Sequence, residues 1–263
     1  MHVLVASIDW HLIWQRIFHP GPVFWRALWT TVYISVISQV AGVLLGLLAA
    51  LMRMSRFAPL RWISATYVLI FRGTPLLVQI FFIYVTVNLP SIHLHLWTIP
   101  SEALTGILAL SLNEGAYMRE IIRAGIDAID RGQMEAAKSL GMRHGQAMRR
   151  VILPQAARVI VPPLGNEFNN MMKNSSLLTI IGVYELFSDA SQGYSATFKS
   201  EYWLVVAFWY LILTTVWTFI QLGIERRLGK SELAEALTFR QRLVLAWDPR
   251  VMWGRGMPWW GNR

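Results

Sequence analysis

Six polar side chains stand out in this sequence because each lies in a long segment that is otherwise rich in apolar residues. They are Asn113, Glu114, Asn166, Glu167, Asn170 and Lys173. Carboxamide, carboxylate and ammonium groups can hydrogen-bond both charged ends of a zwitterionic solute, so these residues are candidates for a solute pathway. An internal structural network, for instance between Glu167 and Lys173, is an open alternative.

Motifs for catalysis, metal binding and nucleotide binding are missing from the sequence. The absence of cysteine excludes disulfides, thiolate metal sites, iron–sulfur clusters and a cysteine nucleophile. Residues 229–231 resemble the end of a phosphate-binding loop, but Ile224 stands where that loop requires its first glycine. His93 and His95 have no further ligands nearby, which disfavours a metal site. We therefore expect neither a catalytic residue nor a bound metal in this chain.

The composition is typical of a membrane protein. Of the 263 residues, 55% are hydrophobic and 15% are charged, against about 25% charged in soluble domains. Ala27–Met52 and Tyr202–Ile224 are uncharged and long enough to cross a hydrocarbon core of about 30 Å. The stretch from Trp62 past Pro90, disturbed by Pro75, is expected to form one further span. The net charge of +9 does not indicate nucleic-acid binding, because the basic residues lie at the ends of spans.

The positions of lysine and arginine determine the number of spans, because short cytoplasmic loops carry an excess of these residues. Three segments are rich in them, namely 53–61, 123–158 and 226–242. Two segments are poor in them, namely 88–101 and 185–201. The two groups alternate across a membrane only if 97–122 and 159–185 are also spans. We therefore predict an all-α membrane protein with five transmembrane helices, the N-terminus outside and the C-terminus in the cytoplasm.

The basic segment at about 131–154 is predicted to form a cytoplasmic helix-turn-helix. Small alanines in its first helix allow another surface to approach closely, and a glycine supplies the turn. The second helix, about 143–153, is expected to end at the proline. The residues concerned are Glu135, Ala136, Ala137, Gly141, Leu153 and Pro154. A solvated basic linker is the alternative interpretation.

The spacing within this segment resembles the EAA loop of ABC-importer permeases. Three residues separate Glu135–Ala137 from Gly141, and nine more precede Val151–Pro154, where valine replaces the commoner isoleucine. Four further segments resemble the polar amino-acid permease subfamily, namely 29–35, 71–79, 111–117 and 166–168. Segment 173–177 departs from the pattern, because relatives often have an aspartate and a threonine after the lysine.

The resemblance implies a three-part chain. Residues 27–225 are the permease domain, 1–26 an external interfacial segment, and 226–263 a cytoplasmic tail. The amphipathic face of residues 10–18 favours a short helix in the outer membrane interface. Gly42 and Gly46 are expected to let two helices approach closely.

The resemblance further implies the permease subunit of an ATP-driven ABC importer that carries polar amino acids into the cytoplasm of a bacterium. In that family the EAA loop is a coupling helix that docks on an ATPase. The implied partners are a second permease, identical or homologous, two cytoplasmic ATPase subunits, an extracytoplasmic substrate-binding protein and the lipid of the plasma (inner) membrane. No cofactor is implied for this chain, since ATP and Mg bind the ATPase.

Two other classes of function remain alternatives. One is a stand-alone ion-coupled amino-acid carrier with Glu114 or Glu167 as proton site, which the coupling motif disfavours. The other is an intramembrane enzyme, which the missing nucleophile and metal ligands disfavour. For the importer, a cationic amino acid is slightly favoured, because an ammonium or guanidinium group would offset the burial of the Glu114 carboxylate.

Overall fold

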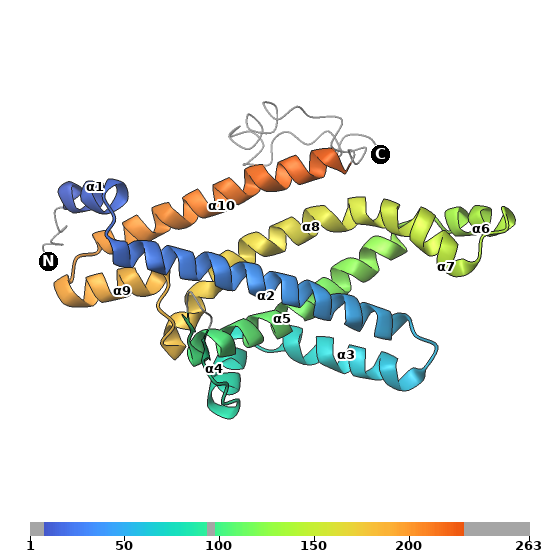
Figure 1. Cartoon of the computed structure of the whole chain (residues 1–263), viewed down its shortest axis with the longest axis horizontal. Helices are drawn as coiled ribbons and strands as arrows, with labels where there is room; N and C mark the ends of the chain where they lie inside the picture. Colours follow the sequence, from blue (N-terminus) through green and yellow to red (C-terminus); the bar gives the residue numbers. More distant parts are fainter. Residues whose placement is uncertain (1–7, 94–97, 229–263) are drawn as a thin grey trace, which may run out of the picture.

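The computed structural model describes residues 8–93 and 98–228. His95, the segment 229–231 and the predicted tail from residue 229 onward lie outside the described residues. The described chain is almost entirely helical (Figure 1). Its elements in chain order are α1 (Trp10–Phe18), α2 (Pro22–Met54), α3 (Ala58–Gly73), α4 (Leu76–Thr86), β1 (Ile92–His93), β2 (Thr98–Ile99), α5 (Ser101–Asp127), α6 (Arg131–Ser139), α7 (His144–Ala147), the π-helical turn η1 (Met148–Ile152), α8 (Leu153–Asn174), the 3-10 helix η2 (Ser175–Ile181), α9 (Leu186–Thr197) and α10 (Glu201–Arg227).

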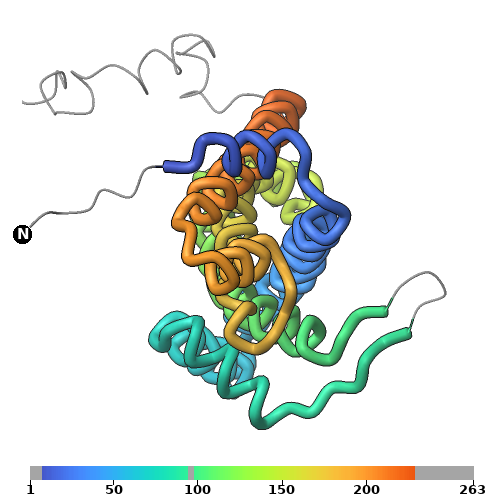
Figure 2. The backbone as a smooth tube through the Cα atoms, turned by 90° about the vertical axis from the view of Figure 1, so that its left-hand side faces the viewer, coloured from blue at the N-terminus to red at the C-terminus, as the bar shows by residue number. Residues whose placement is uncertain are grey.

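Four long helices, α2, α5, α8 and α10, run along the long axis of the molecule (Figure 1). At one end lie α6, α7 and η1, and we call residues 128–152 the α6 end. At the other end α1 and α9 lie beside the first turns of α2 and α10, and we call this group the α9 end. Figure 2 looks at the molecule from the α9 end and shows the long helices side by side. The long helices therefore connect two ends that are far apart.

Within residues 8–93 and 98–228, two helices, α2 and α10, are long and apolar enough to cross a membrane. The pair α3 and α4 would be a third crossing if the two count as one span, but they are bent by 109° relative to each other. Helices α5 and α8 have 27 and 22 residues, which at about 1.5 Å per residue is also enough for a bilayer. Their charged residues make them less apolar.

The break between α3 and α4 differs from the single Pro75-disturbed span that the sequence predicts. Pro75 has no N–H and disfavours helical geometry at Thr74, which is extended at ψ 150°. The carbonyl groups freed at the break accept side-chain hydrogen bonds. Gln79 Nε2 donates to the oxygens of Phe71 and Thr74 at 2.9 and 3.0 Å, and Asn113 Nδ2 donates to Phe71 at 3.0 Å. Side chains thus replace the lost helical bonds, as an apolar environment requires.

Helices α2 and α5 pack closely because glycines face the contact. A β-carbon at Gly42 would lie 2.5 Å from Cγ of Glu114. One at Gly46 would lie 2.9 Å from the backbone nitrogen of Arg119 and 3.0 Å from the carbonyl oxygen of Gly115. The backbone cannot move aside as a flexible side chain can. The predicted role of the two glycines in helix approach is confirmed.

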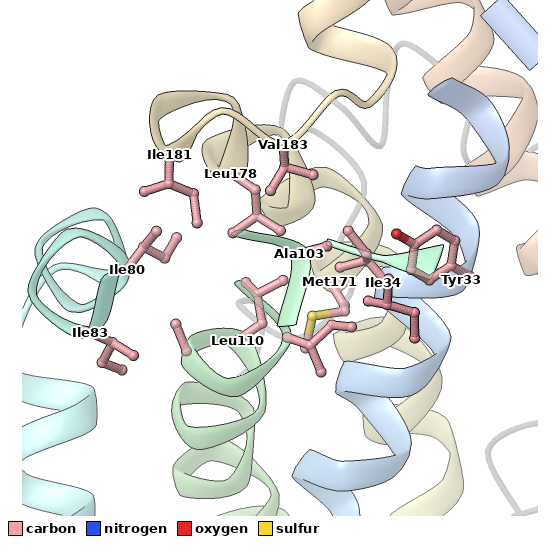
Figure 3. Packing of buried hydrophobic residues seen from close by; sticks show 13 residues of the cluster. Tyr33, Ile34, Ile80, Ile83, Ala103, Leu110, Met171, Leu178, Ile181 and Val183 are labelled. Atoms are coloured by element: carbon pink, nitrogen blue, oxygen red, sulfur yellow. The ribbon is translucent and has the colours of Figure 1, made fainter. Parts of the chain in front are cut away.

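The largest apolar cluster lies where α2, α4, α5, α8 and η2 meet (Figure 3). Its most buried large members are Ile34 from α2, Ile80 from α4, Leu110 from α5 and Leu178 from η2. A second cluster around Phe24 joins α2 to α9 and α10. The two clusters hold the α9 end and the middle of the bundle together.

A short two-stranded ribbon interrupts the helical pattern between α4 and α5. Strands β1 and β2 are antiparallel, with Ile92 opposite Ile99 and His93 opposite Thr98. Nδ1 of His93 lies 3.1 Å from Oγ1 of Thr98. The all-α prediction therefore needs a small correction, which is this pair of two-residue strands.

Candidate functional site

The predicted first helix of the coupling segment is α6, and both of its ends have defined caps. Oδ1 of Asp130 accepts a 2.6 Å hydrogen bond from the N–H of Gly132. At the other end Gly141 adopts φ +80°. Its N–H donates to the carbonyl of Lys138 at 2.9 Å, while that of Met142 donates to Ala137 at 3.1 Å. This is the Schellman arrangement, which a left-handed glycine permits.

Helix α6 presents an exposed surface of mixed character. Glu135 and Ala136 are exposed, whereas Ala137 is buried against the rest of the α6 end. Leu140, at the last turn, is 82% exposed and has the highest exposed fraction among the large apolar side chains of the described residues. The predicted contact residues thus divide into an outward pair and an inward alanine. Leu140 adds an apolar contact that the motif alone does not mark.

The second half of the segment corrects the prediction that its helix ends at Pro154. Helix α7 is followed by the π-helical turn η1, in which the N–H of Leu153 donates to the carbonyl of Met148, and α8 then continues to Asn174. Pro154 lies in the first turn of α8, where a missing N–H is tolerated. Nε2 of Gln155 reaches Oε1 of Gln133 on α6 at 3.3 Å. The segment is therefore continuous with α8.

The second half of α5, which the predicted topology places toward the cytoplasm, carries a series of ion pairs that leads to the α6 end. Arg123 pairs with Asp127 at 2.6 Å and with Glu120 at 3.5 Å, and Glu120 also pairs with Arg119. Arg119 is 5% exposed, and its Nε donates to Oγ of Ser64 on α3 at 3.3 Å. The sequence analysis assigns Arg119 no role. The structure shows that it ties α5 to α3.

One face of α8 is polar and exposed in this chain. Asn166, Asn170 and Lys173 are exposed at i, i+4 and i+7, which places them on one side of the helix. Glu167 is half-buried at the edge of this face. Six positions separate Glu167 from Lys173, so they point to different sides, and no ion pair joins these two described residues. The suggested internal pair is therefore not formed.

The two candidates on α5, Asn113 and Glu114, are buried and already have partners. Asn113 bonds the α3–α4 break and also donates to Oε1 of Gln79 at 2.9 Å. Oε1 of Glu114 accepts a 3.0 Å bond from Nε2 of Gln39 on α2. These two residues therefore connect helices, whereas the α8 residues are open to a partner or a solute.

Glu185 is a buried carboxylate that the sequence analysis missed. It is 0% exposed and caps the start of α9 by accepting from the N–H of Ser188 at 2.9 Å. The hydroxyls of Thr179 and Tyr210 each donate to it at 2.8 Å. Glutamate is not a usual helix cap, so no local signal identifies this role. The carboxylate joins η2, α9 and α10.

No group of three or more His, Cys, Asp or Glu side chains in residues 8–93 and 98–228 is arranged to hold a metal ion. The ionisable pair at the α9 end is of another kind. Nζ of Lys199 donates to Oδ2 of Asp9 at 2.8 Å. This hydrogen bond lowers the pKa of Asp9 and raises the pKa of Lys199. Both groups are at the surface, so the pair locates α1 without a large energetic role.

Comparison with known proteins places most of the chain in one family. Residues 42–230 match the family described as binding-protein-dependent transport system inner membrane component. The chain is 39% identical over 229 residues to the L-cystine transport system permease protein TcyB of Bacillus subtilis, covering 86% of this chain and 94% of that protein. It is 40% identical over 225 residues to the arginine transport system permease protein ArgU of Corynebacterium glutamicum, covering 82% and 71%.

A solved structure agrees with these sequence matches. It is the crystal structure of an amino acid ABC transporter with histidines, which this chain matches with a TM-score of 0.72 at 38% identity. The match covers 84% of this chain and 99% of the solved one.

Proposed function

Because this chain belongs to the family of binding-protein-dependent transport system inner membrane components, we propose that the polar face of α8 lines the route of its substrate. The chain is the permease subunit of an ABC importer of polar amino acids, and it lies in the inner membrane with multiple spans. ATP hydrolysis belongs to a separate subunit of such transporters, and no cofactor is expected in the permease. The ion-coupled carrier and the intramembrane enzyme are no longer needed as explanations.

We propose that the chain crosses the membrane five times, by α2, the bent pair α3 and α4, α5, α8 and α10. The arginine-rich segments then lie in the cytoplasm with the α6 end and the C-terminus, and the N-terminus lies outside. Residues 27–225 form the permease domain, 226–263 a cytoplasmic tail, and the helix within 1–26 lies in the outer interface. Exposed Trp10, Trp14 and Phe18 on one face of α1 support that last assignment.

Reporter fusions test this topology. A fusion after Asn88 is expected to report the outer side, and one after Arg143 the cytoplasm. The reverse pattern would contradict both the topology and the assignment of the α6 end to the ATPase.

The α6 end is proposed to dock in a groove of the ATPase. Its exposed Glu135, Ala136 and Leu140 form the contact, while Ala137 and Gly141 hold the helix in shape. Leu153 and Pro154 carry the movement into α8, with which the segment is continuous. Glu135→Lys, which inverts a charge at the contact, and Leu140→Ser, which removes the apolar one, are each expected to uncouple ATP hydrolysis from uptake. Normal uptake with both variants would leave α6 as a linker.

A second permease, identical or homologous, is proposed to cover the polar face of α8. Asn166, Asn170 and Lys173 are exposed on a helix that we place in the membrane, where a lipid-facing charge costs about 2.5–3.5 kcal/mol. A water-lined pathway between two permeases removes that cost. This exposed face is the observation that carries the proposal. Glu167 borders the pathway, and Asn113 and Glu114 support it from α5.

The carried substrate is proposed to be a polar amino acid delivered by an extracytoplasmic binding protein, with a cationic one favoured. The relatives named above transport cystine and arginine, and the solved relative was crystallised with histidines. The carboxylates of Glu114 and Glu167 give the interior a preference for a cationic side chain.

The deciding experiment is uptake into proteoliposomes that contain the permease, its ATPase and its binding protein. Labelled arginine, histidine, cystine and glutamine are compared, each with ATP alone and with an ion gradient alone. We expect uptake only with ATP, and an Asn170→Leu variant with an apolar side chain in the polar face is expected to lose most of it. Glu114→Gln is expected to reduce uptake of arginine and histidine more than that of glutamine. Uptake driven by the ion gradient would contradict the proposal.

A further inference from the structure

The last turns of α9 and its connection to α10, residues 192–200, contain a backbone conformation that their sequence does not favour. Phe198 has φ 55° and ψ 23°, and it is the one non-glycine residue with positive φ among the described residues. A β-carbon makes this left-handed region costly, and glycine or asparagine usually occupies it at the end of a helix. The chain uses glycine at its two other such positions, Gly141 and Gly182. A phenylalanine at position 198 therefore requires a reason.

Burial does not provide that reason, because the Phe198 side chain is 78% exposed. Among the large apolar side chains of residues 8–93 and 98–228, only Leu140 has a higher exposed fraction. Leu140 and Phe198 lie at the α6 end and the α9 end respectively, which are opposite ends of the molecule in Figure 1. Leu140 belongs to the proposed ATPase contact. Phe198 is the similarly exposed apolar side chain at the α9 end, which we place on the outer side of the membrane.

The turn holds Phe198 in place before any partner arrives. The N–H of Phe198 donates to the carbonyl of Tyr194 at 2.6 Å, and the two rings lie 5.9 Å apart, edge to face. Tyr194 in turn contacts the ring of Trp203 on α10 at 5.7 Å. Lys199 is fixed by its 2.8 Å pair with Asp9. A preorganised aromatic side chain loses little conformational entropy on binding.

The surroundings of Phe198 favour a protein partner over lipid. Polar side chains that are exposed around it include Gln192, Ser195, Thr197, Lys199 and Ser200. An apolar anchor within a polar rim is the usual arrangement of protein interfaces. The face proposed to meet lipid is instead on α1, where Trp10 and Trp14 are exposed.

We propose that residues 192–200 form a docking surface for the extracytoplasmic binding protein, with Phe198 as the anchor that enters an apolar pocket of that partner. The inference rests on the proposed function, because it uses the outward position of the α9 end and the existence of a binding protein. The strained backbone is retained because it projects the ring toward this partner.

The test uses the complete transporter in lipid nanodiscs and measures ATP hydrolysis as its binding protein, saturated with arginine, is titrated. Phe198→Gly removes the ring and suits the left-handed backbone, so the fold is preserved. We expect the half-saturating concentration of binding protein to rise about tenfold or more, with basal hydrolysis and thermal stability unchanged. Phe198→Tyr is expected to retain the wild-type value. Phe57→Ala is the matched control. Phe57 is a 62% exposed phenylalanine at the start of α3, in the connection from α2 that we place in the cytoplasm.

The possible results separate the docking surface at residues 192–200 from the proposed importer function on which it rests. An unchanged half-saturating concentration in Phe198→Gly, beside a stimulated wild type, would overturn the inference alone. A wild type that the binding protein does not stimulate would overturn the proposed function and this inference with it.

Photo-crosslinking provides a second, independent measurement. The chain has no cysteine, so Phe198→Cys introduces the one thiol of this subunit, which is labelled with benzophenone maleimide. We expect illumination to link it to the binding protein and Phe57→Cys to give no such product. Crosslinks from position 198 to lipid alone would show a membrane anchor and overturn the docking surface.

Discussion

The α6 end and the α9 end both close a helix with a left-handed residue beside an exposed apolar side chain, but they are built differently. At the α6 end Gly141 takes the left-handed position at φ +80° and Leu140 is exposed just before it. At the α9 end Phe198 takes both roles itself. The α6 end thus separates backbone geometry from contact chemistry, and the α9 end combines them in one residue.

The connections of the two ends to the rest of the molecule also differ. The α6 end follows α5 after a short non-helical turn, and through η1 it is continuous with α8. The α9 end is held across the bundle by polar contacts, among them the buried Glu185 carboxylate with Thr179 and Tyr210. If the α6 end docks on the ATPase as proposed, we expect its movement to pass into α8. The α9 end instead fixes the positions of η2, α9 and α10 relative to each other.

The largest effect is expected from Gly141→Pro at the α6 end. Proline fixes φ near −65° and has no N–H, so it is incompatible with φ +80° and removes the bond to Lys138. We expect amino-acid uptake by the assembled transporter to fall by about tenfold or more, because the coupling contact is lost. Membrane insertion, measured by the yield of the purified permease, is expected to be retained.

Gly145→Ala is the matched control for this variant. Gly145 lies in the same segment without a positive φ, and a β-carbon there would have nothing within 4 Å. Wild-type uptake is expected. If Gly145→Ala reduces uptake as much as Gly141→Pro does, the loop tolerates no change at all, and the left-handed cap is not the cause.

The same difference explains what the sequence could and could not predict. The turn at the α6 end was predictable because glycine marks it, and the long apolar helices followed from uncharged runs. At the α9 end the short helix over residues 10–18 was predicted from its amphipathic pattern. The backbone at Phe198 and the cap at Glu185 were not predicted, because Phe198 gives no turn signal and Glu185 is an unusual cap. The sharp bend at Thr74 and Pro75 and the π-helical turn before Pro154 were missed, since proline alone predicts disturbance but not its geometry.

Removing the buried carboxylate tests the stabilising role of the α9 end. Glu185→Ala leaves the hydroxyls of Thr179 and Tyr210 and the N–H of Ser188 without their acceptor. We expect a loss of about 2–3 kcal/mol in stability, seen as a lower melting temperature of the purified permease in detergent. Glu135→Ala, which removes an exposed carboxylate at the α6 end, is expected to leave the melting temperature unchanged. Equal melting temperatures for both variants would show that the α9 end is not held by this residue.

A smaller effect is expected from Pro154→Ala, which tests the junction between the α6 end and α8. Proline disfavours a regular helix in the turn before it, and η1 accommodates it with a bond from Leu153 to Met148. Alanine allows a regular α-helix there and shifts the register of the α6 end relative to α8. We expect the number of amino acids imported per ATP to fall by about two- to fivefold, while the melting temperature stays constant or rises. An unchanged ratio would show that the π-helical turn plays no part in coupling.

The smallest effect is expected from pH, at the ion pair between Asp9 and Lys199. The hydrogen bond lowers the pKa of Asp9 from its ordinary 3.8, so its contribution is complete above that value and is lost as the pH falls through the lowered pKa. The pKa of Lys199 is raised from 10.5, so its contribution is complete below that value and is lost as the pH rises through the raised pKa. Both groups stay charged between about pH 5 and pH 9, and we expect neither the melting temperature nor the effect of Lys199→Met to vary in that range. If the wild-type melting temperature changes there and the Lys199→Met value does not, the pair titrates near neutral pH and the α9 end depends on it more than its exposed position implies.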